Sequence, residues 1–167
     1  MAEGTDRNTP VPLAGAAAEF LELRRIAVTG VSRSARDHSG NAIYVRLRDR
    51  GYEVFAVNPN ADVVEGDPSF ADLASIPGGV DGVVIATHPD RAVATVQQCI
   101  DLGVGYVWMH HGPAATSVLP VAVGLGRDHG LRVIDGGCPL MFGPTADLGH
   151  RCLRIVLSAM GRLPREV

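Results

Sequence analysis

Short apolar runs alternate along the chain with segments whose apolar positions recur every three or four residues. The apolar runs end at Gly, Asn or other polar residues, which is typical of strands. They predict strands at residues 25–30, 53–57, 82–86, 105–109 and 131–134. The periodic segments predict helices at residues 12–23, 41–50, 89–102, 118–125 and 148–160, with one or two helical turns at 69–76.

The predicted strands are almost wholly apolar, as in residues 82–86, rather than alternating between apolar and polar side chains. Such strands are typical of a parallel sheet with helices on both faces, and their alternation with helices is typical of βαβ units. We therefore predict an α/β fold, a Rossmann-like three-layer αβα sandwich with a mostly parallel sheet of five or six strands. Residues 11–167 are expected to form a single domain after a disordered leader at residues 1–10.

Composition narrows the classes of function. The chain has 167 residues, of which 46% are hydrophobic and only 5% aromatic, so one domain with an aliphatic core is expected. The net charge of -3 argues against nucleic-acid and anionic-membrane binding. All 15 basic residues are Arg, which excludes a Lys Schiff base and a P-loop lysine. The chain shows neither a signal-peptide pattern nor a long apolar run, so we expect a cytoplasmic protein with reduced thiols.

The three cysteines are too scattered for a disulfide framework or a CxxC zinc site. Cys99 and Cys152 fall on apolar helix stripes and are expected in the core, whereas Cys138 follows a predicted strand and is expected to be the most accessible thiol. His110 and His111 are not assigned to a metal with Cys138, because adjacent side chains of an extended chain point in opposite directions. A reactive role for Cys138 stays open.

In a parallel sheet of this kind, ligands bind beyond the carboxyl ends of the strands, where the strand order reverses. The segments that follow the predicted strands should converge on one rim, and they are residues 30–34, 58–60, 87–89, 110–112 and 135–138. The first of these segments, residues 30–34, is the strongest indication of a ligand site. Between Gly30 and a helix that starts near Asn41, the chain supplies serine hydroxyls, backbone N–H groups, Arg33 and Arg36. This pattern predicts an anion-binding loop at a helix N-terminus.

The same loop departs from the dinucleotide-binding fingerprint. Ser32 and Ala35 stand where that fingerprint has Gly. The second predicted strand is followed by Asn58 rather than by the Asp or Glu that binds the ribose of NAD. An NAD(P) site is therefore disfavoured but stays open, as does a surface turn without a ligand.

Several short motifs within about residues 20–138 together resemble one known family. They are Gly30-x-Ser-Arg-Ser34, Val57-Asn-Pro-Asn60, Ile76-Pro77, Val80-Asp81, Val107-Trp-Met-x-x-Gly112 and Gly130-Leu-x-Val133. The family is that of stand-alone CoA-binding domains, which is similar to the N-terminal part of the succinyl-CoA synthetase alpha subunit and of ADP-forming acyl-CoA synthetases. The element that follows the second strand, residues 57–60, is the most specific of these motifs.

The resemblance implies a coenzyme A site made of three groups of residues. The phosphates would lie on Gly30, Val31, Ser32, Arg33 and Ser34. Arg36 of the same loop is a further candidate from its charge alone, and a solvated arginine there stays open. The adenosine would lie against Val57, Asn58, Pro59 and Asn60. The pantetheine would lie against Thr87, His88, Pro89, Met109, His110, His111 and Gly112. The chain departs from the family pattern at residues 110–111 and in the long stretch 139–147.

These observations predict a small cytosolic protein that binds coenzyme A or an acyl-CoA and has no catalytic residues of its own. The alternatives are an NAD(P)-linked or acyl-CoA-handling enzyme, or an accessory subunit of an acyl-CoA synthetase-type complex. The expected partner is the small-molecule ligand, with no metal, nucleic acid or membrane. A homodimer stays open.

Overall fold

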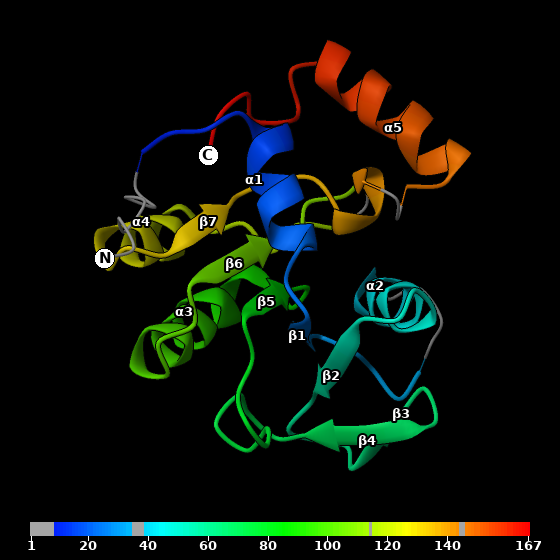
Figure 1. The fold of residues 1–167 in the computed structure, drawn as a ribbon, viewed down its shortest axis with the longest axis vertical. Coiled ribbons are helices and arrows are strands. Elements are labelled where there is room, and N and C mark those ends of the chain that lie inside the picture. Colours follow the sequence, from blue (N-terminus) through cyan, green and yellow to red (C-terminus); the bar gives the residue numbers. More distant parts are fainter. Residues whose placement is uncertain (1–8, 35–38, 114, 144–145) are drawn as a thin grey trace.

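Within the described residues 9–34, 39–113, 115–143 and 146–167 of the computed structural model, seven strands form one sheet (Figure 1). They are β1 (Arg25–Thr29), β2 (Glu53–Val57), β3 (Val63–Val64), β4 (Asp67–Phe70), β5 (Gly82–Ile85), β6 (Tyr106–Met109) and β7 (Arg132–Ile134). Their order is β3-β4-β2-β1-β5-β6-β7, and only the pair β3–β4 is antiparallel. The Rossmann-like α/β fold is confirmed. The sheet has more strands than expected because the sequence does not predict the short β3 and β4.

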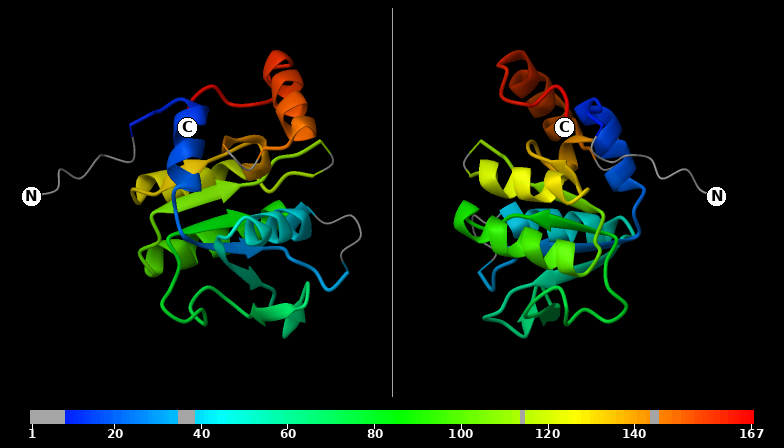
Figure 2. Two further views of the ribbon diagram at one scale, coloured as in Figure 1. Left: turned by 45° about the vertical axis from the view of Figure 1, so that its right-hand side comes forward. Right: turned by 90° about the vertical axis from the view of Figure 1, so that its left-hand side faces the viewer.

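Helices cover both faces of the sheet, as Figures 1 and 2 show. The described helices are α1 (Leu13–Leu21), α2 (Ser39–Asp49), α3 (Ala92–Asp101), α4 (Pro120–Asp128) and α5 (Leu148–Ala159), with 3-10 turns η1 (Pro89–Arg91) and η2 (Pro139–Met141). The helices α1 and α2 pack on one face, and α3 and α4 pack on the other. Residues 1–8, most of the predicted leader, lie outside the described residues.

Successive residues of the central strands point to opposite faces of the sheet, so each strand contributes to two cores. In β1, Ile26 and Val28 join the core beneath α1 and α2, whereas Ala27 joins the core beneath α3 and α4. All three side chains are fully buried. This double burial is the physical reason for the continuous apolar runs in the sequence.

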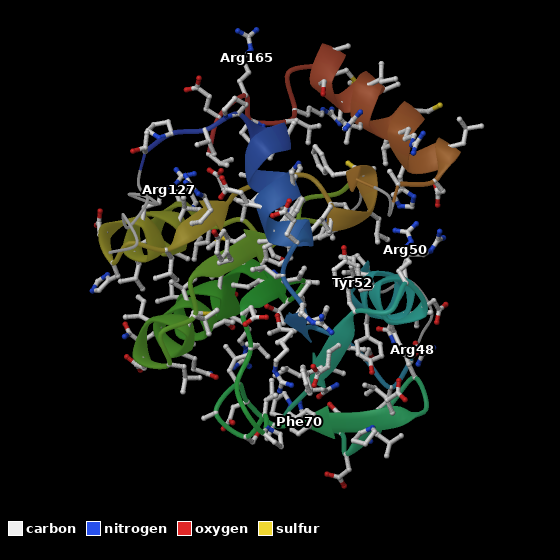
Figure 3. The ribbon with its side chains drawn as sticks, viewed as in Figure 1. Arg48, Arg50, Tyr52, Phe70, Arg127 and Arg165 are labelled. Atoms are coloured by element: carbon white, nitrogen blue, oxygen red, sulfur yellow. The ribbon has the colours of Figure 1, made fainter. Side chains whose placement is uncertain are left out.

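Residues 69–76 do not form the predicted helical turns. Phe70, labelled in Figure 3, ends β4, which pairs with β2. Beyond it, the carboxylate of Asp72 accepts the backbone N–H of Ser75 at 2.8 Å and fixes a turn. Leu73 and Ile76 are buried by this turn. Their helix-like spacing therefore reflects two anchor points of a loop rather than one face of a helix.

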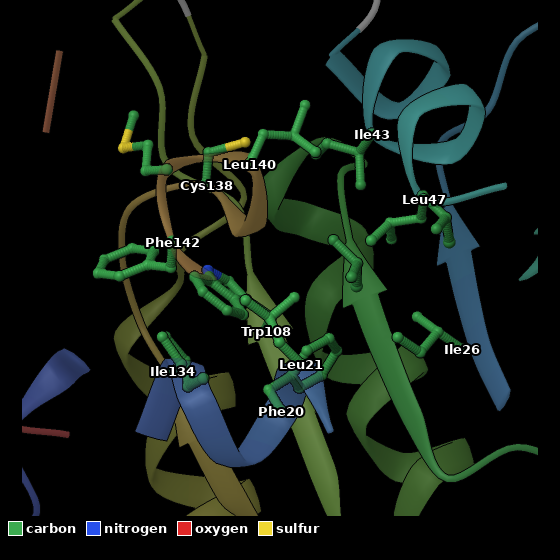
Figure 4. Close-up of a cluster of buried hydrophobic side chains, with 14 of the residues drawn as sticks. Phe20, Leu21, Ile26, Ile43, Leu47, Trp108, Ile134, Cys138, Leu140 and Phe142 are labelled. Atoms are coloured by element: carbon green, nitrogen blue, oxygen red, sulfur yellow. The ribbon is translucent and has the colours of Figure 1, made fainter. Parts of the chain in front are cut away.

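The core beneath α1 is built around Trp108 of β6 (Figure 4). Phe20 of α1 meets the Trp108 ring edge-on at a centroid distance of 5.4 Å, and Phe142 meets it at 5.7 Å. The indole N–H donates to the carbonyl oxygen of Gly136 at 3.0 Å. Because η2 and Phe142 close this core, residues 139–142 at the start of the long stretch after Cys138 have a structural role.

The exposure of two cysteines is the reverse of the prediction. Cys138 is only 5% exposed, and burial raises the pKa of its thiol to about 12. Cys99 is buried as expected. Cys152 is exposed, because the apolar stripe of α5 faces away from the sheet and Leu157 is the buried residue of that helix. The predictions of a core Cys152 and an accessible Cys138 are wrong.

Candidate functional site

A cleft of about 650 Å³ lies at the carboxyl ends of β1, β2 and β5. In the sheet β1 has β2 on one side and β5 on the other, so the strand order reverses at this point. Doubly wound sheets bind ligands at such a switch point, in cavities of this size. The cleft is lined by Thr29, Gly30, Val31, Ser32, Val57, Asn58, Pro59, Asn60, Ala71, Asp72, Leu73, Ala86, Thr87, His88, Arg91, Ala94, Thr95 and Gln98.

Two glycines let backbone segments meet at the floor of the cleft. Gly30 has a φ of +80°, and a Cβ atom there would lie 2.5 Å from the carbonyl oxygen of Ala86. Gly40, in the first turn of α2, approaches Gly30 just as closely. Gly30 therefore allows β1, β5 and α2 to converge, and a side chain at this position would strike the backbone after β5 before it reached the cleft.

The conformation of the first loop is fixed by Asn41 of α2. The Ser32 N–H donates to Oδ1 of Asn41, and Nδ2 of Asn41 donates to the Ser32 carbonyl, both at 2.8 Å. The same amide nitrogen donates to Oε1 of Glu65 at 2.6 Å. The Ser34 N–H donates to Oγ of Ser32 at 3.2 Å. These two backbone N–H groups thus serve the loop itself, and the serine hydroxyls are the donors that it offers to a ligand.

The antiparallel pair β3–β4 is held against α2 and places Glu65 beside Asn41. Arg48, labelled in Figure 3, donates to Oδ2 of Asp67 at 2.6 Å and to the Glu65 carbonyl at 3.0 Å. The Tyr44 hydroxyl donates to the same Asp67 oxygen at 2.9 Å. The Arg48 bond, followed by that from Tyr44, lowers the pKa of Asp67, so the carboxylate stays ionised. This network supports the cleft from outside.

The segment after β2 lines the cleft with all of its predicted residues. Asn58 donates from Nδ2 to the Val31 carbonyl at 2.8 Å, and its Oδ1 accepts the Asn60 N–H at 2.8 Å. Asn58 therefore ties the second loop to the first, while Val57 and Pro59 contribute apolar surface to the wall.

The segment after β5 contributes Thr87 and His88 to the wall, whereas Pro89 begins η1 outside it. Within the described residues, the buried Thr87 hydroxyl has no hydrogen-bond partner. His88 is exposed, and its Nδ1 lies 3.1 Å from a carboxylate oxygen of Asp90. A buried hydroxyl without a partner in a cleft wall is a group that a ligand can satisfy.

The positive charge of the cleft comes from a residue that the sequence does not single out. Arg91, at the end of η1, is the one arginine among the described cleft-lining side chains. Arg33 and Ser34 are exposed and lie outside the cleft wall. Arg36 falls outside the described residues.

The segment after β6 lies one strand further along the rim and does not line the cleft. Met109 is fully buried in the core, and the His111 N–H donates to the Gly137 carbonyl at 2.9 Å. His110 is 6% exposed; burial, with a smaller contribution from His111, lowers its pKa to about 4. The imidazole is therefore uncharged at neutral pH. A Cβ atom on Gly112 would lie 3.0 Å from Cε1 of that ring.

The described part of the chain contains no cluster of three or more His, Cys, Asp or Glu that could hold a metal ion. None of its helices is long and apolar enough to cross a membrane.

A family model described as a CoA binding domain matches residues 24–144. The chain is 26% identical over 99 residues to the uncharacterized protein YneT of Bacillus subtilis, covering 57% of this chain and 73% of YneT. It is 34% identical over 85 residues to the carbamoyl phosphate synthase large chain of Gemmatimonas aurantiaca, covering 45% of this chain. It spans only 8% of that synthase.

Solved structures share the fold at low sequence identity. A hypothetical protein from Pyrococcus horikoshii superposes with a TM-score of 0.72 at 21% identity, covering 92% of this chain and 99% of its own. The cell-free ID.343 protein of Thermus thermophilus superposes with a TM-score of 0.66 at 22% identity, covering 78% of this chain and 95% of its own. The apo dinucleotide-forming acetyl-coenzyme A synthetase 1 of Ca. Korarchaeum cryptofilum superposes with a TM-score of 0.57 at 24% identity, covering 66% of this chain and 25% of the synthetase.

Proposed function

Because this chain belongs to the CoA-binding domain family, we propose that it binds coenzyme A or an acyl-CoA in the cleft at the ends of β1, β2 and β5. The observation that carries the proposal is that the family match and the cleft involve the same part of the chain. The family match over residues 24–144 contains every residue of the cleft wall, and the cleft lies at the switch point of the sheet. The proposal is one of reversible binding and assigns no catalytic residue.

Two groups of the cleft wall and one helix terminus beside it are candidates for the phosphates of the ligand. The Ser32 hydroxyl lines the wall, and Arg91 brings a guanidinium. The N-terminal turn of α2 packs on Gly30, and the free N–H groups of a helix start favour anions. Hydrogen bonds from such donors to an ionised phosphate are stronger than bonds between neutral groups. They support binding by a chain whose net charge is -3.

We propose that the adenosine lies against the wall formed by the segment after β2. Val57, Pro59 and Asn60 of this segment line the cleft. Leu73 of the turn after β4 and Ala94 of α3 add apolar lining for a base. The proposed adenosine site therefore combines an apolar lining with nearby amide groups.

The pantetheine arm would leave the cleft past Thr87 and follow the carboxyl ends of the strands toward β6. The unpartnered Thr87 hydroxyl suits an amide of this arm. Further along, the uncharged imidazole of His110 suits a neutral chain better than an ionised histidine would. The contacts proposed for residues 110–112 concern this distal end of the ligand.

NAD is the competing ligand, and the geometry after β2 argues against it. The Asn58 side chain is occupied by the Val31 carbonyl and the Asn60 N–H, and it brings no carboxylate to a ribose. Asp72 also lines the cleft, but it follows β4 rather than β2, so it is not the acidic residue that a dinucleotide site places after its second strand.

Thermal unfolding with CoA, acetyl-CoA, dephospho-CoA, NAD and NADP tests the proposal. A ligand at 100 times its dissociation constant adds about 2.7 kcal/mol, which raises Tm by several degrees. We expect a rise with CoA and acetyl-CoA and a smaller one with dephospho-CoA, which lacks the 3′-phosphate. A rise with NAD and none with CoA would overturn the proposal. Native mass spectrometry of the purified protein would identify any ligand that it retains.

A further inference from the structure

A hydrogen bond joins two parts of the cleft wall, the turn after β4 and the helix α3. The backbone N–H of Leu73 donates to Oε1 of Gln98 at 3.1 Å. Leu73 is buried, Gln98 is half-buried, and both line the cleft. Asp72, the residue before Leu73, is exposed and also lines the cleft. The side chains of Asp72 and Gln98 are therefore neighbours at the cleft wall.

This bond fixes which way round the Gln98 amide lies. A side-chain amide has an oxygen that accepts and a nitrogen that donates. Because the Leu73 N–H can only donate, the amide atom that faces it is the oxygen Oε1. Within the described residues, the nitrogen Nε2 of Gln98 has no hydrogen-bond partner. Gln98 therefore offers an oriented donor to a ligand.

Asp72 offers an acceptor beside this donor. Its Oδ1 accepts the Ser75 N–H at 2.8 Å, and the Ser75 hydroxyl donates to the Asp72 carbonyl at 2.9 Å. These bonds hold the Asp72 side chain in the turn. The other carboxylate oxygen, Oδ2, has no hydrogen-bond partner in the described part of the chain. It can accept an N–H group of a ligand.

A donor beside an acceptor matches the hydrogen-bonding pattern of adenine. The N6 amino group of adenine donates, and the ring nitrogens on either side of it, N1 and N7, accept. Resting on the proposed function, in which the cleft holds the adenosine of coenzyme A, we propose that Asp72 and Gln98 determine the specificity for its base. Oδ2 of Asp72 accepts the amino group, and Nε2 of Gln98 donates to a ring nitrogen beside it.

The place of Gln98 along α3 agrees with a phosphate at Arg91. Arg91, Ala94 and Gln98 all line the cleft and recur every three or four residues, so they share one face of the helical segment. Arg91 lies two turns before Gln98, about 10 Å along the helix axis. This separation is comparable to the length of a nucleotide. A phosphate at Arg91 and a base at Gln98 can thus belong to one ligand, with the short Ala94 side chain between them.

The test compares two nucleotides that differ only in the base. Adenosine 3′,5′-bisphosphate is the nucleotide part of coenzyme A, and inosine 3′,5′-bisphosphate carries the same phosphates. In hypoxanthine, the base of inosine, O6 accepts where the adenine N6 donates, and N1 carries a proton. Asp72 would then face a second acceptor. Calorimetry with the wild-type chain should show about tenfold tighter binding of the adenosine ligand.

Exchanging the two polar groups makes the test specific. The double variant Asp72→Asn with Gln98→Glu keeps the net charge. Each new side chain keeps an oxygen for the N–H that it accepts, from Ser75 at position 72 and from Leu73 at position 98. The donor now lies at position 72 and the acceptor at position 98. The preference should therefore reverse toward the inosine ligand.

The matched control exchanges the same residue types on α3 outside the cleft wall. Gln97 donates from Nε2 to Oδ1 of Asp101 at 2.8 Å, and both residues are exposed. Gln97→Glu with Asp101→Asn keeps the net charge and allows the same bond with its direction reversed. This variant should keep the wild-type preference for the adenosine ligand. Thermal unfolding of both double variants without ligand checks that each is folded.

The outcomes separate this inference from the proposed function. Equal affinity of the wild-type chain for the two nucleotides, or tighter binding of the inosine ligand, would overturn the inference without any variant. A folded exchange variant at residues 72 and 98 that keeps the adenosine preference would also overturn it. If CoA still raises Tm in these cases, the proposed function stands. If neither CoA nor either nucleotide binds, the proposed function fails and this inference fails with it.

Discussion

A Cβ atom on Gly40, in the first turn of α2, would lie 2.5 Å from the carbonyl oxygen of Gly30 at the end of β1. Cβ atoms in proteins essentially never lie this close to another heavy atom, so the helix and the loop contact each other only through backbone atoms at this point. This contact brings the N-terminus of α2 to the edge of the cleft.

Replacing Gly40 by Ala should therefore lower the free energy of unfolding by about 1–3 kcal/mol, because the added methyl group forces the helix away from the loop. Urea unfolding measures the change. Gly15→Ala is the matched control, since Gly15 is an exposed helical position with nothing within 4 Å of the added atom. It should stabilise the chain by about 0.5–1 kcal/mol. Equal effects of the two substitutions would show that the contact between α2 and the loop is looser than described.

Arg91→Gln should weaken CoA binding by about 1–3 kcal/mol, the cost of losing a charge-assisted hydrogen bond to a phosphate. The loss should be measured by calorimetry at two salt concentrations, because removing a phosphate contact also reduces the salt dependence of binding. Arg165→Gln makes the same change of charge at an exposed position outside the cleft wall (Figure 3). An affinity equal to that of the Arg165 variant would remove Arg91 from the site.

Thr87→Val should separate ligand binding from stability. The Thr87 hydroxyl is buried without a partner within the described residues, so replacing it by a methyl group should leave the free energy of unfolding unchanged or raise it. CoA affinity should fall by about 1 kcal/mol if the hydroxyl bonds the ligand. Ser117→Ala is the contrasting variant. It removes the donor to the Thr87 carbonyl and should lower stability. Unchanged affinity in Thr87→Val would place the pantetheine elsewhere.

His110 should make the fold acid-sensitive. Burial lowers the pKa of His110 to about 4 in the folded chain, below the ordinary histidine value of about 6.5, so the unfolded chain takes up the proton first as pH falls. The stabilisation is fully present above pH 6.5 and is lost as pH falls toward 4, by up to about 3 kcal/mol. Urea unfolding at pH 7.5 and 5 should show the loss. His110→Gln should flatten the profile, whereas the exposed His129, changed in the same way, should leave it intact.

Cys152 should react first with iodoacetamide. Burial raises the thiol pKa of both Cys99 and Cys138 to about 12, which leaves almost no thiolate at neutral pH, whereas Cys152 is exposed. Peptide mapping after brief treatment identifies the labelled cysteine. Preferential labelling of Cys138 would mean that the segment after β7 opens in solution.

The sequence correctly predicts those strands and helices whose residue pattern is compatible with only one kind of secondary structure. Doubly buried strands such as β5 read as apolar runs, and helices such as α3 carry clear stripes. The strands β3 and β4 escape prediction because they are short and include Pro68. The apolar stripe at residues 148–160 correctly predicts the helix α5. Its periodicity does not say whether the apolar side faces the sheet or the solvent.

Much of the candidate cleft is predictable, because the chain leaves parallel strands at one rim of the sheet. The close helix–strand packing that a dinucleotide fingerprint assigns to its last glycine is provided here by Gly40, ten residues after Gly30, so the fingerprint spacing misses it. The sequence patterns do not predict Asn41 and Arg91 as site residues. The signal for Asn41 is an amide among the apolar residues of a helix, and for Arg91 it is a cation two residues after Pro89, in the first turn after β5.

Trp108 is the one tryptophan of the chain, and it lies fully buried where α1, β6 and Phe142 meet. Its fluorescence is therefore a built-in optical reporter of a single place in the molecule. Emission should be blue-shifted in the folded chain and should move to longer wavelength when α1 or the segment after β7 detaches. The same tryptophan can follow unfolding in every variant without an added dye.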